Sequence, residues 1–113
     1  MADSAGGRPY VRLSLMRPKS GQAAQVSEIL NDLVKFFSAQ PGYLDGYTLV
    51  SADPESETGR LTLWRSERDA EHVANTQHVL SLRADLMRLV ESGSHLEKSF
   101  QGEGPPSPGS GPN

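Results

Sequence analysis

The sequence contains no cysteine among its 113 residues, which excludes disulfide bonds, thiolate nucleophiles and cysteine-based metal sites. It also lacks a basic excess, because 11 Lys and Arg against 14 Asp and Glu leave a net charge of -3, which argues against a general nucleic-acid binder. No apolar run approaches the ~18 residues that span a membrane, and residues 1–8 show no hydrophobic signal segment. These absences favour a cytoplasmic protein without nucleic-acid or membrane partners.

The chain has the length of one domain, and its composition changes near the end. The last stretch reads GEGPPSPGSGPN, and its Gly, Pro and Ser residues leave almost no side chains to bury. We therefore expect a flexible N-terminus over residues 1–8, a folded domain over residues 9–101 and a disordered tail over residues 102–113.

Hydrophobic periodicity within the domain predicts the order β-α-β-β-α-β, with the second helix broken in two. The predicted strands cover residues 10–16, 43–51, 60–65 and 95–101, and the predicted helices cover residues 22–39, residues 67–75 and a stretch between Thr76 and Gly93. Ser66 and Thr76 are the predicted N-caps of the last two helices. This order is the split βαβ, or ferredoxin-like, plan of the α+β class.

Apolar residues alternate with polar ones along the first predicted strand, which indicates one buried face. The apolar face carries Val11, Leu13 and Leu15, and the opposite face carries Arg12 and Ser14. The second strand has large groups on both faces, with Tyr43, Tyr47 and Leu49 expected on one and Leu44 and Val50 on the other. Two helices cover only one face of a sheet, so we expect two sheets to pack face to face in a homodimer.

Three short segments carry a family resemblance. They are QPGY at residues 40–43, LTLWRSE at residues 61–67 and NTQH at residues 75–78, with Ala70 and His72 between the last two. Together they resemble the antibiotic biosynthesis monooxygenase family, which belongs to the dimeric α/β-barrel superfamily. The resemblance extends over nearly the whole folded domain. It implies a homodimer with one pocket per subunit, lying between the sheet and the helices.

The resemblance also implies a reaction without a metal, flavin or other cofactor. Some members of the family oxidise polyketide anthrones or hydroquinones to quinones, with molecular oxygen as co-substrate. A phenolate or enolate is electron-rich enough to pass an electron to oxygen, so the protein needs only to bind, deprotonate and shield it. These tasks require an apolar pocket with an aromatic wall, a proton acceptor and a donor for the developing anion.

Four residues are candidates for such a site, and a fifth, His95, is not. Trp64 stands where the family has its pocket tryptophan; a core or interface position is the alternative. His72 and His78 are the expected proton acceptors, because histidine titrates near neutral pH; a surface or capping role is the alternative for each. Arg83 lies near the oxyanion-stabilising arginine of the anthrone oxidisers, and an exposed helix position is its alternative. We expect His95 to be structural.

Arg60 departs from the family pattern, because the anthrone oxidisers carry Asn four residues before the tryptophan. Asn75 cannot replace that residue, since it lies on a different element, but Arg60 still supplies a hydrogen-bond donor for a phenolate. The predicted substrate pocket comprises Trp64, Arg60, Tyr47 and Asn75. The departure puts the anthrone chemistry of the family in question for this chain.

No metal centre is expected. A zinc site built on His72 and His78 lacks a third ligand at a recognisable spacing. The heme-degrading branch of the family uses an Asn, a second Trp and an iron-ligating His. Those three positions hold Ser14, Val73 and Arg83 in this chain, so heme is not expected as a cofactor.

These patterns together predict a cofactor-independent monooxygenase that oxidises a phenolic, hydroquinone or anthrone-type aromatic compound. One alternative is a non-catalytic dimer that binds or senses a small hydrophobic ligand, which Arg60 in place of Asn favours. Another is a non-oxidative isomerase, because a fold does not determine the reaction that it supports.

Overall fold

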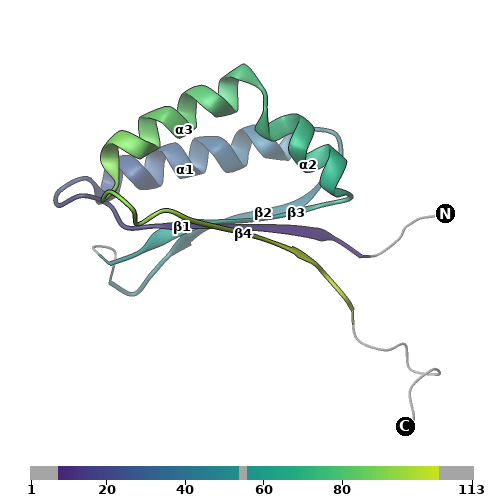
Figure 1. The fold of residues 1–113 in the computed structure, drawn as a ribbon, viewed down its shortest axis with the longest axis horizontal. Helices are drawn as coiled ribbons and strands as arrows, with labels where there is room; N and C mark the ends of the chain where they lie inside the picture. Colours follow the sequence, from purple (N-terminus) through teal and green to yellow (C-terminus); the bar gives the residue numbers. More distant parts are fainter. Residues whose placement is uncertain (1–7, 54–55, 105–113) are drawn as a thin grey trace, which may run out of the picture.

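The computed structural model of the chain describes residues 8–53 and 56–104. Within these residues a four-stranded antiparallel sheet forms one layer, and three helices pack on one of its faces (Figure 1). The strands are β1 (Tyr10–Met16), β2 (Tyr43–Val50), β3 (Thr58–Trp64) and β4 (Leu96–Gln101), and the helices are α1 (Ala23–Ser38), α2 (Glu67–Ala74) and α3 (Gln77–Leu89). The predicted α+β, ferredoxin-like order with a split second helix is confirmed.

The three helices begin and pack largely as local patterns predict. The buried residues of α1 are Val26, Leu30, Leu33 and Phe37, a stripe with helical spacing. Ser66 caps α2, because its hydroxyl accepts a hydrogen bond from the backbone N–H of Asp69 at 3.1 Å. Thr76 stands at the N-cap position of α3, but its hydroxyl donates to the carbonyl of Val73 instead. The predicted N-cap position of Thr76 is therefore confirmed, but its side chain makes no capping hydrogen bond.

The strands lie in the order β2-β3-β1-β4, and each neighbouring pair is antiparallel. The two central strands, β1 and β3, therefore carry the residues at the middle of the helix-facing side. Ser14 of β1 lies opposite Arg60 of β3 on one side and Glu97 of β4 on the other. Residues opposite one another in an antiparallel ladder point to the same side, so this register places all three under the helices.

The buried face of β1 is the reverse of the predicted one. Ser14 and Met16 face the helices and are each 1% exposed. The apolar residues expected to be buried, Val11, Leu13 and Leu15, lie half-exposed on the outer face of the sheet. The helix layer covers the polar side of this strand, so its apolar side stays open in a single chain.

A bulge in β2 separates two tyrosines that the alternation places on one face. The pairing with β3 shifts between Tyr43 and Asp45. Tyr43 consequently packs edge-on against Trp64 under the helices, with ring centroids 5.8 Å apart. Tyr47 is paired with Leu61 on the outer face, where its hydroxyl donates to Asp45 at 2.7 Å.

The predicted termini fall mostly outside the described residues. The structure describes residue 8 of the expected flexible N-terminus and residues 102–104 of the expected disordered tail, so both stay predictions. β3 begins at Thr58, earlier in the chain than predicted. Over the described part of the chain, none of the helices has the length and apolar character needed to cross a membrane.

Candidate functional site

A small cavity lies between the sheet and the helices beside Trp64. Its volume is about 10 Å³, roughly the room that one water molecule needs. We call this space the Trp64 cavity. The residues that line it are Arg12, Phe37, Arg60, Thr62, Trp64, Ala70, Ala74 and Val79. The cavity has the position of the predicted pocket, but it is far smaller than the about 300–1,000 Å³ of ordinary ligand sites.

Trp64 is both a wall of this cavity and a core residue. It is 2% exposed, and its indole N–H donates to the hydroxyl of Thr62 at 3.0 Å. Its ring meets Phe37 edge-on, with centroids 5.6 Å apart, a favourable arrangement for two aromatic rings. Trp64 therefore has both positions considered from the sequence, since it lines a cavity and is also part of the core.

Two arginines, Arg60 buried and Arg12 partly buried, give the cavity a positive charge. The side chains of Arg12 and Arg60 are 13% and 6% exposed. The guanidinium of Arg60 lies 5.1 Å from the centre of the Phe37 ring, within the range at which a ring face attracts a cation. In both arginines Nε is buried and has no hydrogen-bond partner among the described residues. Burial lowers the pKa of Arg60 to about 10; Glu97 opposes this shift, whereas Arg83 and Arg12 add to it.

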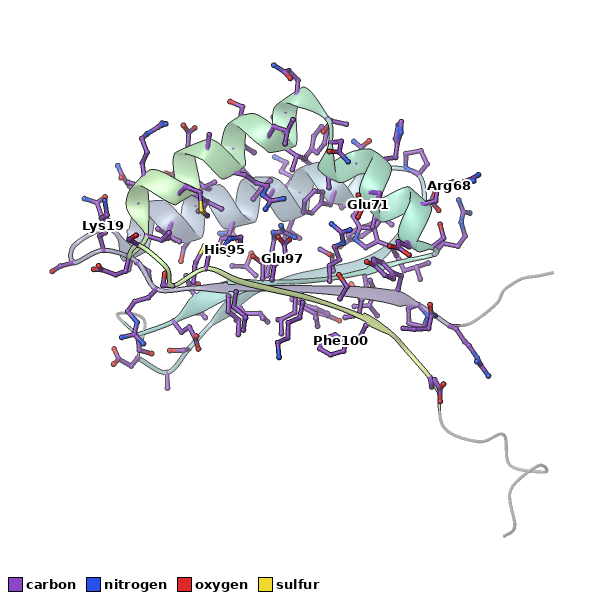
Figure 2. The ribbon with its side chains drawn as sticks, in the orientation of Figure 1. Lys19, Arg68, Glu71, His95, Glu97 and Phe100 are labelled. Carbon is purple, nitrogen blue, oxygen red and sulfur yellow. The ribbon has the colours of Figure 1, made fainter. Side chains whose placement is uncertain are left out.

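Four polar side chains extend the site towards the edge strand β4, and we call Ser14, Arg83, His95 and Glu97 the edge cluster. Glu97 accepts a hydrogen bond from Arg83 at 3.0 Å, and its other oxygen lies 3.6 Å from Arg60. Ser14 Oγ and His95 Nε2 are hydrogen-bonded at 2.8 Å. His95 and Glu97 lie on the helix-facing side of the sheet (Figure 2). In the described part of the chain, no three His, Asp or Glu side chains come together to hold a metal ion.

His95 has the chemistry of a proton acceptor. Burial lowers its pKa from 6.5, Glu97 opposes the shift, and Arg83 and Arg60 add to it. The imidazole is therefore neutral at pH 7, with one ring nitrogen able to accept a proton. Which nitrogen accepts depends on the tautomer and on the direction of the hydrogen bond with Ser14. His95, expected to be structural, is thus the histidine that lies beside the buried arginines.

Of the seven predicted site residues, Trp64 and Arg60 line the Trp64 cavity, and the other five do not: His72, His78, Arg83, Asn75 and Tyr47. His72 is exposed in the last turn of α2. The side chain of Asn75 donates to the carbonyl of Glu71 at 2.8 Å, at the end of the same helix. Tyr47 lies on the outer face of the sheet. Their predicted roles stay predictions, and this geometry gives them no contact with the cavity.

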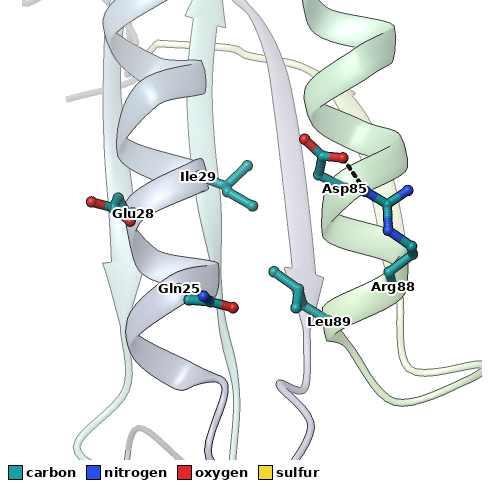
Figure 3. A pocket seen from close by; sticks show the side chains of 6 residues that line it. All are labelled: Gln25, Glu28, Ile29, Asp85, Arg88 and Leu89. Carbon is teal, nitrogen blue, oxygen red and sulfur yellow. Dashed lines mark hydrogen bonds and ion pairs between the residues drawn. The ribbon is translucent and has the colours of Figure 1, made fainter.

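His78 faces a different hollow, a surface groove of about 390 Å³ between α1 and α3. Its ring stacks on Phe36, with centroids 4.3 Å apart. A second groove of about 350 Å³ lies between the same two helices and is lined by Gln25, Glu28, Ile29, Asp85, Arg88 and Leu89 (Figure 3). The charged residues of both grooves are exposed or half-exposed, as on any solvated helix. We therefore place the candidate site at the enclosed Trp64 cavity, and the catalytic role predicted for His78 stays a prediction.

Arg12, Ser14 and Glu97 belong to the site but were not singled out from sequence as its members. A signal for them exists, because Arg12 and Ser14 are polar residues two apart on one strand and so share a face. Arg60 and Thr62 repeat the pattern on β3. Unless the strand pairing is known, a polar face of this kind is predicted to be exposed to solvent.

Comparison with known proteins agrees with this architecture. A family model of the antibiotic biosynthesis monooxygenases matches residues 9–85. The chain belongs to this family. The matched region contains every residue that lines the Trp64 cavity, whereas His95 and Glu97 lie beyond it. A search of curated protein sequences finds no significant match.

Solved structures share the fold of this family member at low sequence identity. A protein from Nitrosomonas europaea, described as an antibiotic biosynthesis monooxygenase, is 19% identical with a TM-score of 0.76, over 85% of this chain and 91% of that one. SnoaB, a cofactor-independent oxygenase from Streptomyces nogalater, is 14% identical with a TM-score of 0.75, over 88% and 97%. A Mycobacterium tuberculosis protein is 17% identical with a TM-score of 0.77, over 88% and 99%. The TM-scores establish a common fold, whereas identities this low leave the substrate open.

Proposed function

We propose that this chain is a cofactor-independent oxygenase that oxidises a phenolic, hydroquinone or anthrone-type compound with molecular oxygen. The observation that carries the proposal is the Trp64 cavity, where aromatic walls adjoin the buried guanidinium group of Arg60 and the partly buried one of Arg12. A site for a phenolate needs both features, because an aromatic wall holds the ring and a fixed cation stabilises its anion. The family match, and the description of SnoaB as a cofactor-independent oxygenase, support this class of reaction.

In the proposed reaction, the substrate extends from the Trp64 cavity towards β4, and His95, which lies near Arg60 and not on the cavity wall, accepts its acidic proton. Arg60 and Arg83 donate hydrogen bonds to the anion that results. The anion passes one electron to oxygen, and for an anthrone the radical pair joins in a carbon–oxygen bond. Loss of water from this peroxide leaves the quinone, so one oxygen atom enters the product and the other leaves as water. A hydroquinone instead gives two electrons and two protons to oxygen, which yields quinone and hydrogen peroxide.

An aromatic ring enters the Trp64 cavity only if the cavity opens, because about 10 Å³ admits no more than a water molecule. Arg12 of β1 forms an ion pair with Glu71 of α2, which joins the sheet to the helix layer beside the cavity. The side chain of Glu71 is 52% exposed, so its carboxylate returns to water when the pair breaks, whereas Arg12 needs a new acceptor, which an anionic substrate would supply.

The outer face of the sheet supports the proposed homodimer. Tyr47, Leu96 and Phe100 are each about half exposed in the single chain. The other apolar residues of this face are Val11, Leu13, Leu15, Leu49, Leu61 and Leu63. An apolar surface of this breadth favours association, and a second copy of the sheet, packed across a two-fold axis, would bury it. In such a dimeric α/β barrel the Trp64 cavity lies on the side of the sheet away from the interface.

Anthrone and a hydroquinone, each mixed with the protein in air, test the proposed activity. Quinone absorbance is expected to rise faster than in the uncatalysed reaction. His95→Gln should lower kcat by about 10²–10⁴-fold, the usual contribution of a general base, and the same change at His78 should cost less. Arg88→Met, at an exposed position on α3, is the control that retains activity. A rate that the protein does not raise for either substrate would refute the oxygenase, and binding without turnover would favour the ligand-binding alternative.

A further inference from the structure

The charges around the Trp64 cavity do not balance. Arg12, Arg60 and Arg83 bring three positive charges to the helix-facing side of the sheet. Arg60 and Arg83 share one carboxylate, Glu97. Arg12 pairs with Glu71, whose half-exposed carboxylate is screened by solvent. The enclosed space therefore has an excess of positive charge that the neighbouring side chains neutralise only in part.

Stability alone does not account for the burial of Arg60. Nε of Arg12 and Nε of Arg60 are buried without a hydrogen-bond partner among the described residues. A buried donor without an acceptor costs free energy, and an apolar side chain of similar volume avoids that cost. The lowered pKa of Arg60, about 10, reports the same unfavourable burial of its charge. A charge held at such a cost, beside a cavity, is a common sign of a binding site.

We propose that Arg12 and Arg60 form a subsite for the carboxylate of an aromatic acid, with the ring of the acid against Trp64 and Phe37. A carboxylate is planar, and its two oxygens match the fork of donors on a guanidinium group. It supplies acceptors for the two buried Nε groups, and its planar shape distinguishes it from a tetrahedral phosphate or sulfonate once the cavity has opened. The inference deepens the proposed function, on which it rests for the oxidation step alone: a carboxylate on the phenolic, hydroquinone or anthrone-type compound is expected to tighten its binding.

Two glutamates compete with the ligand for these arginines, and neither holds its arginine firmly. Oε2 of Glu97 is 3.6 Å from Arg60, beyond the length of a good hydrogen bond. Glu97 keeps Arg83 at 3.0 Å when Arg60 turns to a ligand, so its carboxylate stays paired. Arg12 exchanges the half-exposed Glu71 for a carboxylate shielded from water, where a charge-assisted hydrogen bond is stronger.

Calorimetric titration with 1-hydroxy-2-naphthoate and 1-naphthol tests the subsite, because these phenols share a ring system and differ by one carboxylate. The protein is expected to bind the naphthoate at least about tenfold more tightly, the effect of one hydrogen bond to a charged group. Arg60→Met should remove that preference, so that the naphthoate and 1-naphthol bind the variant with similar affinity. Arg88→Met, a matched change at an exposed arginine, should keep the preference. Equal affinities for the two phenols, no binding of the naphthoate, or a full preference in Arg60→Met would overturn the proposal.

Glu97→Gln tests the same subsite in the opposite direction and does not depend on the folding of an arginine variant. Removal of the competing carboxylate, with its shape retained, should tighten naphthoate binding by about tenfold and leave 1-naphthol unaffected. An unchanged or weaker affinity for the naphthoate would contradict the competition. Selective binding without quinone formation refutes the oxygenase and leaves the subsite, whereas turnover without carboxylate preference refutes the subsite and leaves the oxygenase.

Discussion

Replacement of Arg60 by methionine is expected to stabilise the fold, although it changes a side chain at the centre of the molecule. The arginine side chain is 6% exposed, and methionine fills a similar length of space without a charge. Glu97 is not left unpaired by the change, because Arg83 remains 3.0 Å away. Arg12 and Arg83, whose charges oppose the protonated form of Arg60, lose a like-charged neighbour.

The pKa of Arg60 sets the magnitude of this effect. A fall from the ordinary value of an arginine to about 10 means that the charged form costs about 3 kcal/mol more in the folded than in the unfolded state. Both states are protonated below pH 10, so this cost is constant there and is relieved only as the pH rises above about 10, towards the pKa of an arginine in the unfolded chain. Loss of the contact with the Phe37 ring offsets about 1–2 kcal/mol of the gain. We expect a net stabilisation of about 1–2 kcal/mol at pH 7, or a rise in Tm of about 4–16 °C.

Urea and thermal unfolding followed by circular dichroism measure this change. Arg88→Met is the matched control, since the side chain of Arg88 is 70% exposed and its replacement should alter the free energy of unfolding by less than about 0.5 kcal/mol. A loss of about 2 kcal/mol or more in Arg60→Met would refute the reasoning. That result would identify Arg60 as one half of a structural ion pair with Glu97, because breaking such a buried pair is strongly destabilising.

Three further perturbations have defined outcomes. Leu13→Asp, on the outer face of the sheet, should convert the proposed dimer to a monomer in analytical ultracentrifugation, and a dimer that persists would exclude this face as the interface. Gly59→Ala should destabilise the chain by about 1–3 kcal/mol in urea unfolding, since a Cβ there overlaps a backbone carbonyl of β1; an unchanged midpoint would argue against so close a strand contact. The pKa of His95 should lie below 6.5 in an NMR titration, so its contribution to stability is present above pH 6.5 and lost as the pH falls through the folded pKa. The charged groups that act on His95 are Glu97, which opposes this shift, and Arg83 and Arg60, which add to it. A pKa at or above 6.5 would show that the ring is more solvated or more strongly paired than the structure has it.

Part of the candidate site could be predicted before the fold was known. Arg60 and Trp64 lie four positions apart on one strand, so they point to the same side of the sheet, and both line the cavity. His72 and His78 have the right chemistry, but each points outward from its helix. Their direction depends on how α2 and α3 are rotated on the sheet, which the packing of the buried residues on each helix decides.

The predicted faces of the strands failed for a related reason. Alternation along β1 shows that its two faces differ, but it does not say which of them the helices cover. The helices cover the face with Ser14, so the apolar residues of β1 are left for another surface. In β2, one bulge moves Tyr43 to the side opposite Tyr47, an irregularity that leaves no mark in the alternation.

The sequence by itself determined the order of the elements, the stripe of α1, the cap at Ser66 and the position of Trp64 at the end of a strand. Each of these depends on residues within a few positions of one another, where spacing and propensity act directly. Only the tertiary structure decided that Ser14 lies between Arg60 and Glu97, and that His95 is the histidine beside them. Those neighbours are brought together by strand pairing across more than 30 residues of chain, and the register of such pairing is set by packing of the whole sheet rather than by any local pattern.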